Sequence, residues 1–275
     1  MYNKIKKTII NSFPLQFELV EEILKPSIGI VANEKQISSN KFSKFGGFPI
    51  VNKNHPLLSF LDFNYSMLCQ INIIELKKID IEYQLPNQGI LYFFINPNLT
   101  KFTSDNYKVV FIEGNGDFEF IKEERVSEVV YNESEINFFE HYTFPSYQEK
   151  SRLKISDKID DDIIESIYEE VCEITGKSLE IGHQILGEPQ ATQGTVKYWW
   201  ALQSLGYAEF ESLNNSQKQE ISNLQEDFIL LLQIDLEDPN LSFTNLETGA
   251  LYFGILKDDL KNKNFDNVVL VYQSS

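Results

Sequence analysis

The sequence predicts an α+β fold in which two duplicated antiparallel β-units pack into one pseudo-symmetric domain with flanking helices. The main observation is a segment that occurs twice. Residues 68–72 (LCQIN) precede 89–95 (GILYFFI), and residues 232–235 (LQID) precede 249–255 (GALYFGI). Each pair reads as two apolar strands joined through a turn, which is typical of antiparallel β-structure.

A second observation is that a Gly-x-Pro turn comes before each copy, at 47–49 and at 187–189. Two or three strands are rarely stable alone, so the copies are expected to share one core. We therefore expect a single domain over residues 1–275, with repeat units at about 43–122 and 181–273.

The N-terminal segment predicts a helix followed by a strand. Pro14 suits the first turn of a helix, and the residues after it place apolar side chains on one face, so a helix is expected over 2–25. A strand over 27–32 and a polar loop over 33–40 follow. Gly46 and Gly47 then mark a turn that needs positive φ or a close backbone approach.

The first repeat predicts strands over 67–73 and 90–95. The second of these is apolar on both faces, which is typical of a covered, central strand. Two more strands are expected over 107–112 and 118–122, and residues 113–117 have the composition of a hairpin loop between them.

The middle of the chain predicts less regular structure. Residues 124–156 are polar and are expected to be irregular. A helix is expected over 157–175, with acidic residues in its first turns and Gly176 as its end. A second helix over 216–227, the second repeat and a last strand over 268–272 complete the chain.

The charge balance of the chain limits the classes of partner that it is expected to bind. The chain has 24 basic and 41 acidic residues, a formal net charge of -17. Nucleic acid and anionic membrane surfaces need clustered Lys and Arg, so neither is an expected partner. The acidic surface suits solubility or a basic partner protein. Cys69 and Cys172 are too few for a disulfide framework, and no apolar run is long enough to span a membrane, so we expect a soluble, cytoplasmic protein.

Enzyme motifs are missing from the sequence. It has no phosphate-binding loop, zinc-protease helix, CxxC pair or nucleophile elbow. The glycines at 114 and 116 lack the third glycine of a dinucleotide fingerprint, and the acidic run 160–162 is explained by a helix start without metal. The sequence therefore predicts no cofactor and no metal, and non-enzymatic activity is favoured.

His183 is the main candidate for chemistry, because it lies among glycines and amides in the segment 181–193. Its imidazole would act as a general base or ligand contact, or would fix a loop through backbone hydrogen bonds, and the second reading is favoured. Gln70 and Gln233 occupy equivalent places in the repeats. They would either satisfy neighbouring strands and turns or line a shared groove. Residues 198–200 (YWW) favour core packing over a stacking surface.

Four segments follow one another in order along the chain: 43–49 (SKFGGFP), 68–72, the pattern His183-Gln184-x-x-Gly187-x-Pro189-x-x-x-Gln193, and 231–235 with 249–253. Together they resemble the YwqG-like family, bacterial proteins with a domain of unknown function. The resemblance implies an α+β fold with a duplicated β-unit and brings no established catalytic residues. It also suggests an immunity or accessory role, since some relatives lie beside secreted toxins. The chain departs from the pattern at 51–56 and at Gly254.

Two functional hypotheses follow. The first is a non-enzymatic protein-binding module, such as an immunity factor that masks a basic toxin. The second is a small-ligand binder or enzyme with a site between the repeats. The ligand-binding candidates for that site are Gly46, Gly47, Gln70, His183, Gln184, Gln193 and Gln233.

Overall fold

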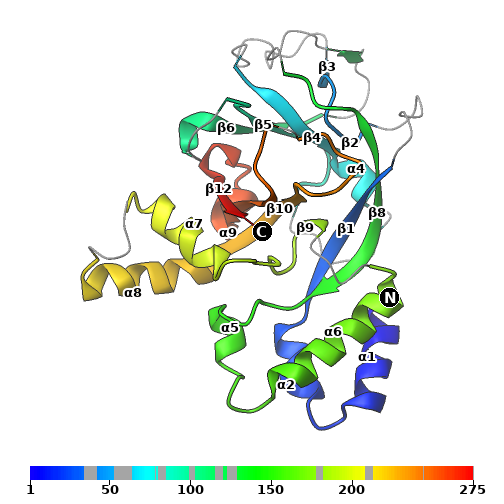
Figure 1. Ribbon diagram of the computed structural model, residues 1–275, viewed down its shortest axis with the longest axis vertical. Helices are drawn as coiled ribbons and strands as arrows, with labels where there is room; N and C mark the ends of the chain where they lie inside the picture. Colours follow the sequence, from blue (N-terminus) through cyan, green and yellow to red (C-terminus); the bar gives the residue numbers. More distant parts are fainter. Residues whose placement is uncertain are drawn as a thin grey trace.

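The computed structural model describes residues 1–33, 42–52, 64–77, 79, 85–98, 103–114, 120–122, 129–177, 182–207, 213–243 and 245–274. Within these ranges the fold is mixed α and β, built on an antiparallel sheet that nearly closes into a barrel (Figure 1). The sheet order is β12-β11-β10-β9-β1-β8-β2-β4-β5-β6. A separate small sheet pairs β3 with β7.

The strands are β1 (Lys25–Asn33), β2 (Lys44–Phe45), β3 (Ile50–Asn52), β4 (Ser66–Asn72), β5 (Ile90–Ile95), β6 (Tyr107–Ile112), β7 (Phe120–Lys122), β8 (Ser134–Thr143), β9 (His183–Ile185), β10 (Phe228–Asp235), β11 (Gly249–Leu256) and β12 (Val269–Ser274). The α-helices are α1 (Tyr2–Ser12), α2 (Phe17–Ile23), α4 (Ile73–Leu76), α5 (Lys150–Leu153), α6 (Asp161–Thr175), α7 (Val196–Ser204), α8 (Asn215–Leu224) and α9 (Lys257–Lys261). Short 3-10 turns are η1 (Ser104–Asn106), η3 (Gln225–Asp227) and η4 (Phe265–Asn267).

The long pair β1–β8 forms the middle of the sheet and separates two runs of strands. One run is β9-β10-β11-β12 and the other is β2-β4-β5-β6. In both runs the strands follow in chain order away from the middle, and β4 and β10 each carry a register shift against their next neighbour. The main core cluster takes apolar side chains from both runs and from β1, so the two runs share one core.

The N-terminal helix predicted over 2–25 is wrong, because the chain forms α1 and α2 and then enters β1 at Lys25. Pro14 lies in the turn between the two helices, where its missing N–H and its ring would break a continuous helix. Leu15, expected on the apolar face, is 89% exposed. The two helices pack with α6 on a separate apolar cluster at one end of the molecule (Figure 1).

The prediction that residues 124–156 are irregular is also wrong. This segment contains β8, which pairs with the whole of β1 from Lys25 opposite Thr143 to Asn33 opposite Glu135. Polar side chains hide the strand in the sequence, but several of them find partners in the sheet. The hydroxyl of Tyr142 donates to the carboxylate of Glu140 at 2.8 Å, for example.

Helix α7 was not expected, and its packing explains the glycine at position 254. Trp200 on α7 is fully buried, and its indole N–H donates to the carbonyl of Tyr252 at 3.0 Å. A Cβ on Gly254 would lie 2.3 Å from the Trp200 ring. The glycine at 254 is therefore what lets the indole lie directly on β11. The core-packing interpretation of residues 198–200 is confirmed for Trp200, whereas Trp199 is 37% exposed.

Several strand predictions are confirmed. The segments 90–95 and 107–112 are strands with the expected bounds, and all six residues of β5 are buried. Gly176 ends α6 in the left-handed conformation, as expected. The stretch 53–56, most of the loop 33–40 and residues 115–117 of the hairpin loop lie outside the described residues. Among the helices described, none combines the length and apolar character needed to cross a bilayer.

Candidate functional site

The two Gly-x-Pro turns have the same backbone form. Gly46 and Gly47 have φ of 57° and 69°, and the first turn therefore shows the positive φ expected from its sequence. Leu186 and Gly187 have φ of 61° and 76° in the second turn. A Cβ on Gly187 would lie 2.5 Å from the hydroxyl oxygen of Thr143. These glycines are required by the backbone itself.

The candidate glutamines hold these turns against the strands. The side-chain amide of Gln70 donates from Nε2 to the carbonyl of Phe42 at 2.8 Å and accepts at Oε1 from the N–H of Ile50 at 2.8 Å. Gln233 does the same with the carbonyl of Gly182 at 2.8 Å and the N–H of Gln190 at 2.9 Å. Both glutamines are fully buried. Their internal bonds favour a structural role over a groove contact.

A tyrosine completes each of these hydrogen-bond sets. Tyr92 faces Gln70 across β4 and β5, and its hydroxyl donates to the carbonyl of Ile50 at 2.8 Å. Tyr252 faces Gln233 across β10 and β11, and its hydroxyl donates to the carbonyl of Gln190 at 2.7 Å. The residue after each turn proline is thus held through both its N–H and its carbonyl.

His183 uses both ring nitrogens within the fold. Nδ1 lies 3.0 Å from the backbone nitrogen of Asp235, whose N–H only donates, so Nδ1 must accept and the ring proton must be on Nε2. Nε2 then donates to the carboxylate of Asp238 at 2.9 Å. The ring is 3% exposed and packs on Phe45, with centroids 4.7 Å apart. In this geometry the imidazole has no free lone pair for base catalysis or metal binding.

An acidic cavity of about 580 Å³ lies beside His183. Its charged lining consists of the carboxylates of Asp235, Glu237 and Asp238 and the amine of Lys177, and β1 and β8 supply an apolar wall. We call it the acidic cavity. The lining therefore holds three carboxylates against one lysine.

Burial and hydrogen bonds set the electrostatics of this cavity. Burial is the largest influence on Asp235 and raises the pKa of its carboxyl above the ordinary value. Burial also opposes ionisation of Asp238, but hydrogen bonds from His183 and Asn240 outweigh it and hold the pKa of Asp238 below its usual range. Burial lowers the pKa of Lys177. Of Asp235 and Asp238, it is therefore Asp238 that stays ionised to lower pH.

The remaining candidates lie elsewhere. The amide of Gln184 is buried and donates to the carbonyl of Glu188 at 2.8 Å. Gln193 donates to the hydroxyl of Ser274 at 2.6 Å, at the edge strand β12. Of the seven predicted ligand-binding residues, His183 is the one in the described lining of the acidic cavity. The ligand-binding role of all seven stays a prediction.

The sequence analysis missed the acidic lining residues. Their signal is the cluster of Asp235, Glu237 and Asp238 at the end of β10, three carboxylates within four residues. Only the first of them belongs to the quoted repeat, and charge runs after a strand are ordinarily solvated. Among the described residues, no three His, Cys, Asp or Glu side chains come together as a metal site.

A second buried charged group lies at the N-terminus of α7. Lys197 forms an ion pair with Glu188 at 2.6 Å, and both side chains are largely buried. Glu149 is 1% exposed nearby, and burial is the main cause that raises the pKa of its carboxyl to about 7, with the charge of Glu188 adding to it and that of Lys197 opposing it. The sequence analysis gave no signal for this cluster.

The comparisons with known proteins give one match. A family model described as a domain of unknown function, DUF1963, matches residues 43–274. A search of curated proteins finds no match. The matched region runs from Ser43, just before β2, to the end of β12, and so contains every described strand except β1. Because the match spans well over half of the chain, the protein belongs to the DUF1963 family.

Proposed function

We propose that this protein is a non-catalytic binding module for a basic partner protein, and that the acidic cavity receives a cationic side chain of that partner. The observation that carries the proposal is the lining of the cavity, where Asp235, Glu237 and Asp238 face a single lysine. A Lys or Arg side chain entering the cavity would gain charge-assisted hydrogen bonds there.

The charge of the whole chain supports the same partner. A formal net charge of -17 attracts a basic protein over distances of about a Debye length and increases the association rate. The effect of such a field falls as salt is added. Binding that weakens steeply between low and moderate salt is therefore expected.

The polar side chains predicted as site residues are occupied by hydrogen bonds within the fold, which supports a binding role over a catalytic one. Both nitrogens of His183 are hydrogen-bonded, and the amides of Gln70 and Gln233 are used by the turns. A general base needs a free lone pair within reach of its substrate. An immunity factor against a basic toxin, as the YwqG-like resemblance suggests, is the narrower form of this proposal.

We also infer that the two runs of strands derive from a duplicated β-unit. The support is the equivalence of their contacts: a turn with two positive-φ residues, a buried glutamine that holds it and a tyrosine that donates to the same carbonyl. Under this inference the repeat units of about 43–122 and 181–273 are halves of a single domain.

The alternative is that the acidic cavity binds a small molecule. Its volume of about 580 Å³ lies in the range of small-ligand pockets. This alternative is tested in the same experiment as the protein-binding proposal.

The experiment measures binding of an amidated hexalysine peptide by titration calorimetry at low and moderate salt, with two charge-matched variants. Glu237→Gln removes an exposed carboxylate from the cavity. Asp162→Asn removes an equally exposed one at the start of α6, and the 15 residues of that helix place it about 20 Å from the end that adjoins the cavity.

We expect Glu237→Gln to weaken peptide binding by at least about threefold and Asp162→Asn to leave it nearly unchanged. Equal effects of the two variants would mean that the peptide binds only to diffuse surface charge, and would contradict the proposal. Affinity capture from the native cells, repeated with both variants, then separates a basic protein from a small molecule as the natural ligand.

A further inference from the structure

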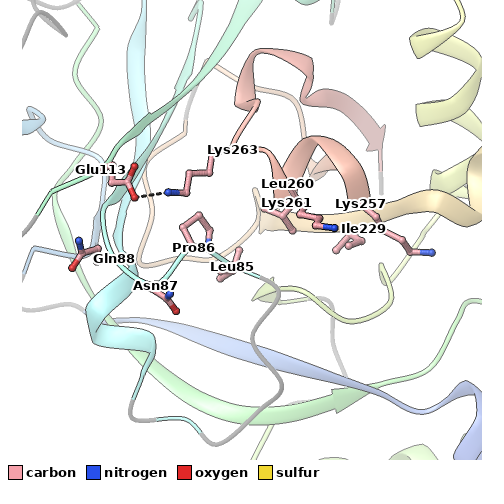
Figure 2. A pocket seen from close by; sticks show the side chains of 10 residues that line it. All are labelled: Leu85, Pro86, Asn87, Gln88, Glu113, Ile229, Lys257, Leu260, Lys261 and Lys263. Carbon is pink, nitrogen blue, oxygen red and sulfur yellow. Dashed lines mark hydrogen bonds and ion pairs between the residues drawn. The ribbon is translucent and has the colours of Figure 1, made fainter.

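A second cavity, of about 550 Å³, lies between the two runs of strands (Figure 2). One wall is the turn 85–88 before β5, together with Glu113 after β6. The other wall is Ile229 on β10 and the segment 257–263, which contains α9. We call it the basic cavity. Interfaces between structural units are common places for ligand sites.

The charge of this cavity is opposite to that of the protein. Lys257, Lys261 and Lys263 line it against the single carboxylate of Glu113. The chain as a whole has 24 basic and 41 acidic residues, so three lysines at one cavity reverse the general balance. Such a local excess creates a positive potential that attracts anions.

The lysines differ in how far they are neutralised. Lys263 forms an ion pair with Glu113 across the cavity (Figure 2). Lys257 lies 3.6 Å from Asp227 in an exposed pair of the weak kind, and its amine also donates to the carbonyl of Glu226 at 2.7 Å. Lys261 has no ion-pair or hydrogen-bond partner among the described residues. At least one full positive charge is therefore available to a ligand.

The inner wall is apolar. Leu85 and Leu260 are 5% and 3% exposed, and Pro86 and Ile229 lie beside them in the lining. Asn87 and Gln88 add amide groups at the rim. An occupant that matches both walls carries an anionic group for the lysines and a compact apolar body for the leucines.

We propose that the basic cavity binds a small organic anion, in which a phosphate or carboxylate group is attached to a compact apolar body. Lysine amines bind such groups as point charges with three donors each. Lys261 contacts the anionic group, and the apolar body lies on Leu85 and Leu260. The proposal is independent of the acidic cavity and of the basic partner.

The test uses phenyl phosphate and phenylacetate as probes, with binding followed by chemical shifts of the backbone amides of Leu85, Asn87 and Gln88 and of residues 257–263. Benzyl alcohol and phenyltrimethylammonium are the neutral and cationic controls of similar shape. We expect both anions to bind and to shift these amides, and the two controls to bind at least about threefold more weakly.

Two variants give opposite expected effects. Lys261→Gln removes the unpaired charge and should weaken phenyl phosphate binding by at least about threefold. Glu113→Gln removes the lining carboxylate, frees Lys263 and should strengthen binding by a similar factor. Both side chains are exposed, so folding should be retained. Lys7→Gln, an exposed lysine on α1, is the matched control.

The proposal is overturned if no probe shifts these amides, if benzyl alcohol binds as well as phenyl phosphate, or if Lys261→Gln and Lys7→Gln have equal effects. If only one of the two anions binds, the cavity is assigned to that acid group. Binding of hexalysine is unaffected by either cavity variant under this proposal, so its failure is distinguishable from failure of the basic-partner proposal.

Discussion

Glu149→Gln should stabilise the folded protein at alkaline pH, because burial of the ionised Glu149 carboxylate is unfavourable. The carboxyl is 1% exposed, and its Oε1 has no hydrogen-bond partner among the described residues. The backbone N–H of Lys197 and the hydroxyl of Thr195 donate to the carboxylate, yet burial dominates and raises its pKa from 4.5 to about 7. Glutamine has nearly the same shape and carries no charge to bury.

The size of the effect follows from proton linkage. The folded state keeps the Glu149 proton up to about pH 7, whereas the unfolded chain releases it near its ordinary pKa of 4.5. Between these values the folded state binds more protons, so the free energy of unfolding falls as pH rises. The difference of between two and three pKa units corresponds to about 3 kcal/mol, lost in full above pH 7. The variant lacks this loss.

The assay is urea unfolding followed by tryptophan fluorescence from pH 5 to pH 8 at constant ionic strength. We expect wild type and Glu149→Gln to be similar near pH 5, and the variant to gain about 1–3 kcal/mol relative to wild type at pH 8. Glu173→Gln, at an exposed position on α6, controls for the loss of one negative charge. A wild-type-to-variant difference that does not change with pH, or a variant less stable at pH 8, would refute the reasoning.

Three further outcomes are expected. Gly187→Ala should lower the free energy of unfolding by more than about 1 kcal/mol, because φ at Gly187 is 76° and the new methyl group would meet Thr143. Gly206 has a similar φ of 72° but open space around it, so Gly206→Ala should cost less. Tyr252→Phe should lower the midpoint of thermal unfolding and cost about 1–2 kcal/mol, because the partly buried carbonyl of Gln190 loses its donor. Cys69 should not react with a thiol reagent until the protein unfolds, since it is fully buried and burial raises its pKa well above 9; rapid reaction in native buffer would contradict this.

The sequence predicts the strands whose residues are mostly apolar and misses a strand rich in polar residues. Strand β5 is apolar and buried throughout, β6 is mostly apolar and partly buried, and the bounds of both are recovered. Strand β8 has glutamates and an asparagine among its residues, so its alternation is weak, although it pairs along the full length of β1. Its stability comes from a partner more than 100 residues away in the chain, which local patterns do not encode.

Some residues of the candidate site can also be predicted from the sequence, and others cannot. Gly47 and Gln70 can be selected from the sequence because each has an equivalent in the other copy. In the structure Gly47 adopts the positive φ of the turn, and Gln70 bonds the backbone beside that turn. The acidic cavity depends on residues from β1, β8, β9 and β10 and from the segment just after α6, which come together only in the folded chain. The buried Glu149 is one of many glutamates, and only its burial sets it apart.

One pair of matching positions in the two runs of strands carries different residues. Ser43 and His183 occupy matching places, since the hydroxyl of Ser43 accepts from the N–H of Asn72 at 2.9 Å and Nδ1 of His183 accepts from the N–H of Asp235 at 3.0 Å. The neutral pair Ser43 and Asn72 in one run is thus replaced by the ionisable pair His183 and Asp235 in the other, and the side chain accepts from the equivalent backbone N–H in both. His183 differs from Ser43 in having a second ring nitrogen, Nε2, which donates to the carboxylate of Asp238 at 2.9 Å. These unequal positions adjoin the acidic cavity, so substitutions there should change binding while those at the shared glutamines and tyrosines change stability.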